Sequence, residues 1–208
     1  EAASPGYDLV IVGTHGRQGV AHLIVGSVAE RVVCHVDKPV LVARKVSSCV
    51  RRICVAVDFS RASWSAFEYG RMLAEAFRAE LQIVHVIPPL TAVEAMELKA
   101  LQSPDDSTLS LHDYARQRAH DEMKRFFAQG SLYIEAEADV RVGDPAREIV
   151  EAAKEMEADF IVMGTHGRNA SVLGGMGSVA ERVVRTAACS VLTMRWTPAP
   201  AESRVQAD

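Results

Sequence analysis

The sequence predicts an α/β protein with an open, five-stranded parallel sheet and helices on both faces. Two observations indicate this class. Residues 51–196 alternate short apolar segments of strand length with segments that carry apolar residues at helical spacing, which is typical of a parallel sheet. The stretch 159–168 also recurs at 8–17, with the same last five residues. Part of the chain is therefore duplicated.

The first copy lies in residues 1–46, where we expect a strand, a glycine-containing loop, a helix and a second strand, at 9–12, 13–26, 27–34 and 40–43. Pro39 begins the second strand, where its missing N–H is tolerated. Residues 47–51 form a short polar join before a new pattern starts. We therefore interpret 1–46 as the last part of a first module and 51–196 as a complete module.

The complete module has five predicted strands, at 53–57, 81–87, 133–142, 160–163 and 191–194. The first is β-branched and nearly all apolar, as strands buried on both faces are. Ser60 is the expected N-cap of the first helix, and Asp144 caps a later helix with Pro145 as its first residue. Further helices are expected at 93–101, at 109–129 and from Gly177. Residues 197–208 lack periodicity and are predicted to be disordered.

Composition excludes several classes of function. A net charge of −4 gives no basic field for nucleic acid or an anionic membrane surface. The apolar runs are too short to span a bilayer, and no signal-peptide pattern opens the sequence. The four cysteines have no CxxC spacing, so we expect reduced thiols in a cytoplasmic protein, most of them small buried hydrophobes.

The duplicated stretch has the pattern of a phosphate-binding loop. An apolar strand ends at Gly164, Gly167 follows, and after nine intervening residues Gly177-Ser178 begins a helix. Free backbone N–H groups at a helix start suit a phosphate. The same glycines could instead only turn the chain, but two copies with equal spacing favour binding. The first copy contains the corresponding residues Gly13, Gly16, Gly26 and Ser27.

A carboxylate is expected beside this loop. In an open parallel sheet, ligands bind at the carboxyl ends of the strands where the winding reverses. If the reversal lies between the first and fourth strands of 51–196, then residues 58–60 border the same crevice as residues 164–168. Asp58 would then face the phosphate cradle.

Four motifs in this order resemble the universal stress protein family: Val55-Ala56-Val57-Asp58-Phe59-Ser60, the strand containing His85-Val86, Val142-Gly143-Asp144-Pro145, and the glycine loop with Gly177-Ser178. The resemblance covers 51–196, and 1–46 resembles the last third of a second module. It implies a Rossmann-like, adenine nucleotide hydrolase-like sheet of order 3-2-1-4-5 and a cytoplasmic role in stress response. It also places the chain with the ATP-binding subclass, since both copies keep the loop.

The resemblance also implies roles for individual residues. Asp58 would contact the ribose, a phosphate or a bound Mg²⁺, and the backbone of Ala56 would lie near the ribose. The backbone of Val86 would contact the adenine edge, and Gly164 would approach the ribose. The phosphates would be held by Gly167, Gly177, Ser178 and Val179. The rest of the implied site consists of Val57, Ser60, Met163 and Arg168.

Other polar residues of the repeat have simpler interpretations. His15 and His166 have no acidic neighbour at the spacing of a triad or a metal site, so loop-shaping or surface roles are expected. Arg168 could screen phosphate charge or remain solvated. Glu181 and Arg182 are expected to form helix-surface ion pairs of small value.

The first module lacks three strands and has no counterpart of Asp58 or Val86. It can therefore form only half of a nucleotide site, and its first strand is expected to leave an open edge. We interpret the chain as a tandem protein with an incomplete first module, whose missing strands belong to a longer chain or come from a second chain. We expect 40–43 to pair with 191–194, either within the chain as a pseudo-dimer or across a homodimer.

The leading functional hypothesis is an ATP-binding regulator rather than an efficient enzyme. The sequence has no GxxxxGK[ST] loop and no evident base to orient water. A slow Mg²⁺-dependent ATPase remains an alternative. A second is an autophosphorylating phosphotransferase with Ser178 or Ser171 as acceptor, and a third is a dimerisation scaffold without nucleotide.

Overall fold

The computed structural model describes residues 6–14, 26–44, 49–101, 110–128, 137–167 and 175–195. The strands are β1 (Val10–Gly13), β2 (Val40–Ala43), β3 (Arg52–Val57), β4 (Glu80–Ile87), β5 (Glu137–Val142), β6 (Phe160–Gly164) and β7 (Ser190–Met194). The helices are α1 (Ser27–His35), α2 (Arg61–Phe77), α3 (Ala92–Leu101), α4 (Leu111–Ala128), α5 (Pro145–Glu155) and α6 (Ser178–Thr186).

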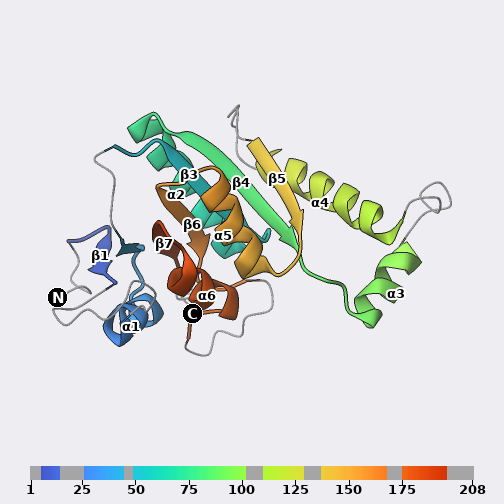
Figure 1. The fold of residues 1–208 in the computed structure, drawn as a ribbon, viewed down its shortest axis with the longest axis horizontal. Helices are drawn as coiled ribbons and strands as arrows, with labels where there is room; N and C mark the ends of the chain where they lie inside the picture. Colours follow the sequence, from blue (N-terminus) through green and yellow to red (C-terminus); the bar gives the residue numbers. More distant parts are fainter. Residues whose placement is uncertain are drawn as a thin grey trace, which may run out of the picture.

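All of the described strands belong to one seven-stranded sheet of order β1-β2-β7-β6-β3-β4-β5 (Figure 1). The expected five-stranded parallel sheet is therefore corrected, because β2 joins β7 in antiparallel orientation and brings β1 with it. The other neighbouring pairs are parallel. The strands of the second module, taken alone, run β5-β4-β3-β6-β7, the relative order expected for 51–196.

The pairing of β2 with β7 is centred on equivalent residues. Leu41 pairs with Leu192, and these two positions correspond to each other when the two copies are aligned. On either side, Val40 pairs with Thr193 and Val42 with Val191. A contact in which equivalent residues meet each other is isologous, as in a two-fold dimer. The expected pairing of 40–43 with 191–194 is thus present, and it forms within the chain.

Helices cover the two faces of the sheet as predicted. On one face, α2 and α4 pack on side chains such as Ile53, Val55 and Val162. On the other face, α1, α5 and α6 pack on alternating residues such as Cys54 and Ile161. The inner strands are apolar on both sides because both sides are covered.

Most of the predicted helix signals are present. Ser60 caps α2, and Asp144 caps α5 with Pro145 following it. Phe77, the last residue of α2, is 49% exposed. Residues 133–136, the start of the strand predicted at 133–142, and 197–208, the predicted disordered tail, lie outside the described residues.

The cysteines only partly match the expected burial. The structure describes all four and shows no disulfide between them; Cys54 is buried, Cys34 and Cys189 are partly buried, and Cys49 is exposed. Burial raises the pKa of the Cys54 thiol to about 12 and that of Cys189 to about 11. Both therefore remain protonated and poorly nucleophilic at neutral pH.

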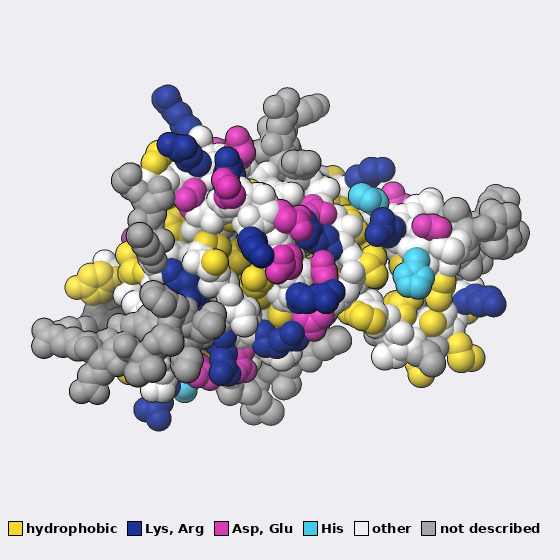
Figure 2. Space-filling view, viewed as in Figure 1, with side chains coloured by type: hydrophobic (Ala, Val, Ile, Leu, Met, Phe, Trp, Pro, Cys, Tyr) yellow, Lys and Arg dark blue, Asp and Glu magenta, His cyan; other side chains and the backbone are white. Residues whose placement is uncertain are grey.

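The surface carries no large block of one charge on the face in Figure 2, where basic and acidic side chains alternate over the centre of the molecule. Apolar side chains gather at α3, which stands away from the sheet and exposes Val93, Met96 and Leu101. Among the described helices, none combines the length and the apolar composition that crossing a bilayer requires.

Candidate functional site

The carboxyl ends of β3, β4 and β6 lie side by side. Val57 is in register with His85 on β4, and Ala56 is in register with Met163 on β6. The winding reverses here, because β4 lies on one side of β3 and β6 on the other. The side chains of Ala56, Val57, Met163 and Val86 are buried. Their backbone is therefore the part that a ligand at this edge would meet.

Asp58 and Gly167 come together at this edge. A Cβ atom at Gly167 would lie 2.6 Å from Asp58 Oδ2, and one at Gly164 would lie 3.0 Å from Ala62 Cβ in the first turn of α2. Neither glycine takes a positive φ. These positions require glycine for space, because the loop after β6 passes directly against the loop after β3. The carboxylate thus borders the glycine loop, as the sequence predicts.

The loop after β3 is held in an unusual conformation. Phe59 has φ 62°, which is uncommon outside glycine. Asp58 Oδ1 accepts a hydrogen bond from Ser60 N at 3.0 Å, and Ser60 Oγ accepts one from Ser63 N at 3.2 Å. The Phe59 ring stacks on His85 with centroids 4.3 Å apart. These contacts fix the direction of Asp58, and strained residues of this kind concentrate at functional sites.

His85 connects the two strands beneath this loop. Its Nδ1 lies 2.9 Å from Val57 O, so Nδ1 carries the proton and donates to that carbonyl. The sequence analysis used His85 only as part of the strand motif. The contact between His85 and Phe59 could not be predicted from their separation in the sequence, because it depends on the parallel register of β3 and β4.

The start of α6 differs from the starts of α2 and α5. Ser60 and Asp144 cap their helices with side-chain oxygens, whereas α6 has Gly177 as N-cap and no side-chain cap. Gly177 N donates to Thr165 O at 2.8 Å, which ties the helix start to the loop after β6. Gly177 therefore offers no side-chain acceptor to the first-turn N–H groups, those of Ser178 and Val179 among them. Ser178 itself is exposed.

The first copy has the same start without the same surroundings. Gly26 is the N-cap of α1, which also lacks a side-chain cap, and Gly26 N donates to Thr14 O at 3.2 Å. Gly13 ends β1, and Ser27 is the first residue of α1. Among the described residues, however, no strand occupies the position beside β1 that β3 occupies beside β6. None of the described residues supplies this loop with a carboxylate that corresponds to Asp58.

Some predicted loop residues cannot be placed. Gly16, His15, Arg168 and Ser171 lie outside the described residues. His166 is described, and its Nδ1 lies 2.9 Å from Thr165 Oγ1. Thr165 is buried, and its N–H donates to Met194 O at 2.9 Å. His166 is thus linked to the loop backbone through Thr165, as expected for a residue that shapes the loop.

The sequence analysis missed the main contact of Arg182. Arg182, the fifth residue of α6, donates to both carboxylate oxygens of Asp144, at 2.7 and 2.9 Å, and so joins α6 to the N-cap of α5. Glu181 forms the expected surface pair, with Arg185 at 3.3 Å. The Arg182 guanidinium and the N–H of Arg147 hold the pKa of Asp144 below its ordinary value. The motif Gly143-Asp144-Pro145 predicts that Asp144 caps α5 but does not indicate that Arg182 binds its carboxylate.

One carboxylate, Asp58, and the N–H groups at the start of α6 suit a magnesium nucleotide better than a metal ion bound by protein side chains alone. No group of three His, Cys, Asp or Glu side chains forms a metal site in the described part of the chain. Mg²⁺ is commonly held by one or two carboxylates together with the phosphates of its nucleotide. Asp58 beside Gly167 offers one such carboxylate.

Known proteins resemble this chain in both sequence and fold. The model of the universal stress protein family matches residues 1–44 and 50–195. A universal stress protein of Methanocaldococcus jannaschii is 31% identical over 156 residues, which cover 74% of this chain and 87% of the relative. A universal stress protein E homolog of Haemophilus influenzae is 26% identical over 204 residues, covering 94% of this chain and 64% of the relative.

A solved structure agrees with these matches. The crystal structure of a universal stress protein from Archaeoglobus fulgidus is 27% identical, with a TM-score of 0.63, and the match covers 93% of this chain and 64% of that one. The chain thus spans less than two thirds of the length of the Haemophilus and Archaeoglobus proteins. With both copies matched by the family model, the chain belongs to the universal stress protein family, which supports a role in the stress response.

Proposed function

We propose that this protein binds ATP, with Mg²⁺, at the carboxyl edge of β3, β4 and β6 and acts as a nucleotide-dependent cytoplasmic regulator in the stress response. The observation that carries the proposal is the meeting of three features at one edge. These are the Asp58 carboxylate, the glycine loop at Gly164 and Gly167, and the helix start at Gly177, which has no side-chain cap.

Each feature has a role in this proposal. The N–H groups of Ser178 and Val179, with the positive end of α6, bind phosphate oxygens. The backbone of Ala56 and Val86 contacts the ribose and the adenine, since the side chains at both positions are buried. Asp58 contacts the ribose or holds Mg²⁺ against the phosphates. Arg168 screens phosphate charge.

In this proposal the protein binds ATP and is not an efficient enzyme. No described side chain stands out as a base aimed at a water beside the phosphates, since His166 is linked to Thr165 and Asp58 Oδ1 accepts from Ser60 N. Slow hydrolysis is the nearest alternative. Phosphate transfer to the exposed Ser178 is another, and it would leave a phosphoserine after incubation with ATP. A scaffold without nucleotide is the remaining alternative.

The proposed architecture is tandem. Residues 1–46 form part of a first module and 51–196 a complete second one, with the last strands of both paired as β2 and β7. The chain therefore presents one complete site and one half site. We expect one nucleotide per chain.

The first test is to denature the purified protein and identify the released nucleotide by chromatography and mass. One ATP per chain supports the sensor proposal, whereas ADP or AMP supports hydrolysis. A protein that releases no nucleotide and shows no thermal shift with Mg-ATP contradicts ATP binding and favours the scaffold.

A pair of variants tests the location of the site. Gly167→Val places a side chain against Asp58 Oδ2 and should abolish ATP binding. Gly175→Ala is the matched control in the same loop, because a Cβ atom there meets nothing within 4 Å. Equal ATP affinity in both variants would place the nucleotide elsewhere.

A further inference from the structure

Two arginines at equivalent positions exchange contacts between the copies. Arg44 directly follows β2, and Arg195 directly follows β7. Arg44 Nη2 donates to Val184 O at 2.9 Å and to Arg185 O at 3.1 Å, both in the last turn of α6. Arg195 Nη1 donates to Cys34 O in the last turn of α1. Each copy thus supplies the cation at the carboxyl end of the other copy's helix.

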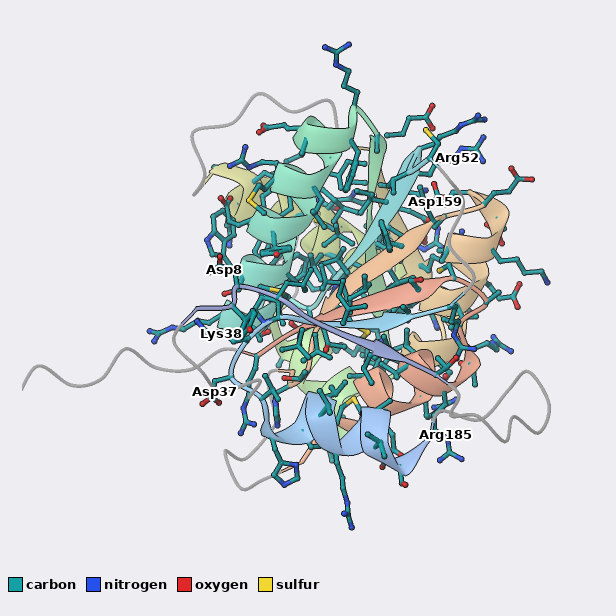
Figure 3. All side chains as sticks on the ribbon, turned by 90° about the vertical axis from the view of Figure 1, so that its left-hand side faces the viewer. Asp8, Asp37, Lys38, Arg52, Asp159 and Arg185 are labelled. Atoms are coloured by element: carbon teal, nitrogen blue, oxygen red, sulfur yellow. The ribbon has the colours of Figure 1, made fainter. Side chains whose placement is uncertain are left out.

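These contacts satisfy groups that a helix leaves without partners. The last four carbonyl groups of an α-helix have no intrahelical donor, and a cation near them also interacts favourably with the helix dipole. In α6, Val183 O accepts from Ala187 N, and Arg44 reaches the next two carbonyls. Figure 3 labels Arg185, whose carbonyl is the second of these acceptors.

The Arg44 guanidinium is partly withdrawn from solvent. Its Nε is buried and has no hydrogen-bond partner among the described residues, and burial lowers the pKa of the guanidinium. Its backbone N–H donates to Ser190 Oγ at 3.0 Å, which fixes the arginine beside the first residue of β7. A side chain held in this way at the junction of two copies acts on α6 directly rather than as a mobile surface charge.

The helix that Arg44 caps is the one that begins at the proposed phosphate site. A helix of nine residues is about 13 Å long at 1.5 Å per residue, and a helix this short is not stable alone. The position of its first turn therefore depends on packing along its length and on its carboxyl end. The cation also adds positive potential on the helix axis behind the phosphates.

We propose that Arg44 is a positioning residue for the nucleotide site of 51–196, so that the first copy serves the complete site although its own site is only half formed. The inference rests on the proposed ATP binding. It assigns to residues 1–46 a role that does not require them to bind nucleotide themselves. It also predicts an asymmetry, because the equivalent Arg195 caps α1, and no carboxylate of the described residues corresponds to Asp58 at the start of α1.

The test compares Arg44→Met with Arg195→Met in the full chain, since methionine keeps much of the aliphatic bulk without the charge or the donors. ATP affinity is measured by calorimetry, and amide hydrogen exchange is measured in α1 and α6. Arg44→Met should weaken ATP binding about fivefold, the order expected from loss of a helix-end cation, with unchanged stoichiometry. It should speed exchange in α6. Arg195→Met should change ATP affinity by no more than about twofold, which is less than the change expected when the cation at the end of α6 is lost. It should speed amide exchange in α1.

Three outcomes separate the possibilities. Failure of the wild-type chain to bind ATP overturns the proposed function and, with it, this inference. Wild-type binding with equal affinities for Arg44→Met and Arg195→Met overturns the inference alone. If Arg44→Met does not fold, Arg44→Lys serves instead, because lysine keeps the charge and loses the paired donors. Wild-type ATP affinity and unchanged amide exchange in α6 for this variant would contradict a positioning role for the guanidinium.

Discussion

The two copies of the repeated stretch, 8–44 and 159–195, align without a gap and share the segments GTHGR and GSVAERVV, but they have very different surroundings. Val162 on β6 is fully buried, whereas the aligned Ile11 on β1 is 63% exposed. The difference in burial comes from the neighbouring elements. Strand β6 lies between β3 and β7, and α2 covers the face that carries Val162. Among the described strands, β1 has only β2 beside it. A strand pattern therefore indicates what a segment can bury, and its position in the sheet decides what it does bury.

The aspartates that precede β1 and β6 show the same difference. Asp159 Oδ2 accepts hydrogen bonds from the N–H groups of Arg51 and Arg52, at 2.7 and 3.1 Å, and so anchors the start of β3. The aligned Asp8 is exposed, and in the view of Figure 3 it lies on the opposite side from Asp159. Asp159 anchors β3, and no described strand occupies the equivalent position in the first copy.

The largest expected effect is on stability. Val162→Ala removes two buried methyl groups from a packed core and should lower the free energy of unfolding by roughly 2 kcal/mol. Ile11→Ala removes more atoms from an exposed edge and should change it by less than about 0.5 kcal/mol. Urea unfolding measures both. A cost of 2 kcal/mol or more for Ile11→Ala would show that the edge of β1 is covered in solution, by a second chain or by another segment.

The next effect is on ATP affinity. A Cβ atom at Gly177 would lie 3.0 Å from Thr165 O, whereas one at Gly26 would lie 3.6 Å from Thr14 O, an ordinary contact. Gly177→Ala should displace the loop from the helix start and weaken ATP binding about tenfold, or ~1.4 kcal/mol. Gly26→Ala should leave the stoichiometry and affinity unchanged, because among the described residues no carboxylate borders Gly26. Calorimetric titration with Mg-ATP compares them, and weaker binding in Gly26→Ala would mean that the first copy also holds nucleotide.

The smallest effect concerns the Asp144–Arg182 pair. The pKa of Asp144 is held below 3.8 by Arg182 and by Arg147 N–H, so Arg182→Gln should raise it while leaving it below that value. A carboxylate whose pKa is lowered by folding stabilises the protein above its unfolded pKa, and this stabilisation is lost as pH falls through the folded pKa. The stability difference between wild type and variant should therefore shrink below about pH 3.8.

An NMR titration of the Asp144 carboxyl measures this pKa directly. Arg31→Gln in the first copy and Arg185→Gln on α6 are the matched controls, and neither should change the pKa of Asp144. An unchanged pKa in Arg182→Gln would show that the backbone N–H of Arg147 alone accounts for the shift.

Local patterns predicted much of what is observed. The caps at Ser60 and Asp144, the start of α6 at Gly177-Ser178 and the placement of β2 and β7 follow from residue types whose preferences act over a few positions. The meeting of Asp58 with the glycine loop followed from a rule about parallel sheets. The nucleotide, the metal and the roles of the individual site residues remain predictions.

The strands, the helices, the duplicated loop and its glycines could be predicted from the sequence, because strand and helix periods, capping groups and glycine spacing are local properties. Three features are known from the folded chain alone: the single seven-stranded sheet, the pairing of Leu41 with Leu192, and the contact of Arg44 and Arg195 each with the other copy's helix. Those contacts join residues about 150 positions apart. They form only when two strands with unpaired edges meet, and no local preference encodes which edge meets which.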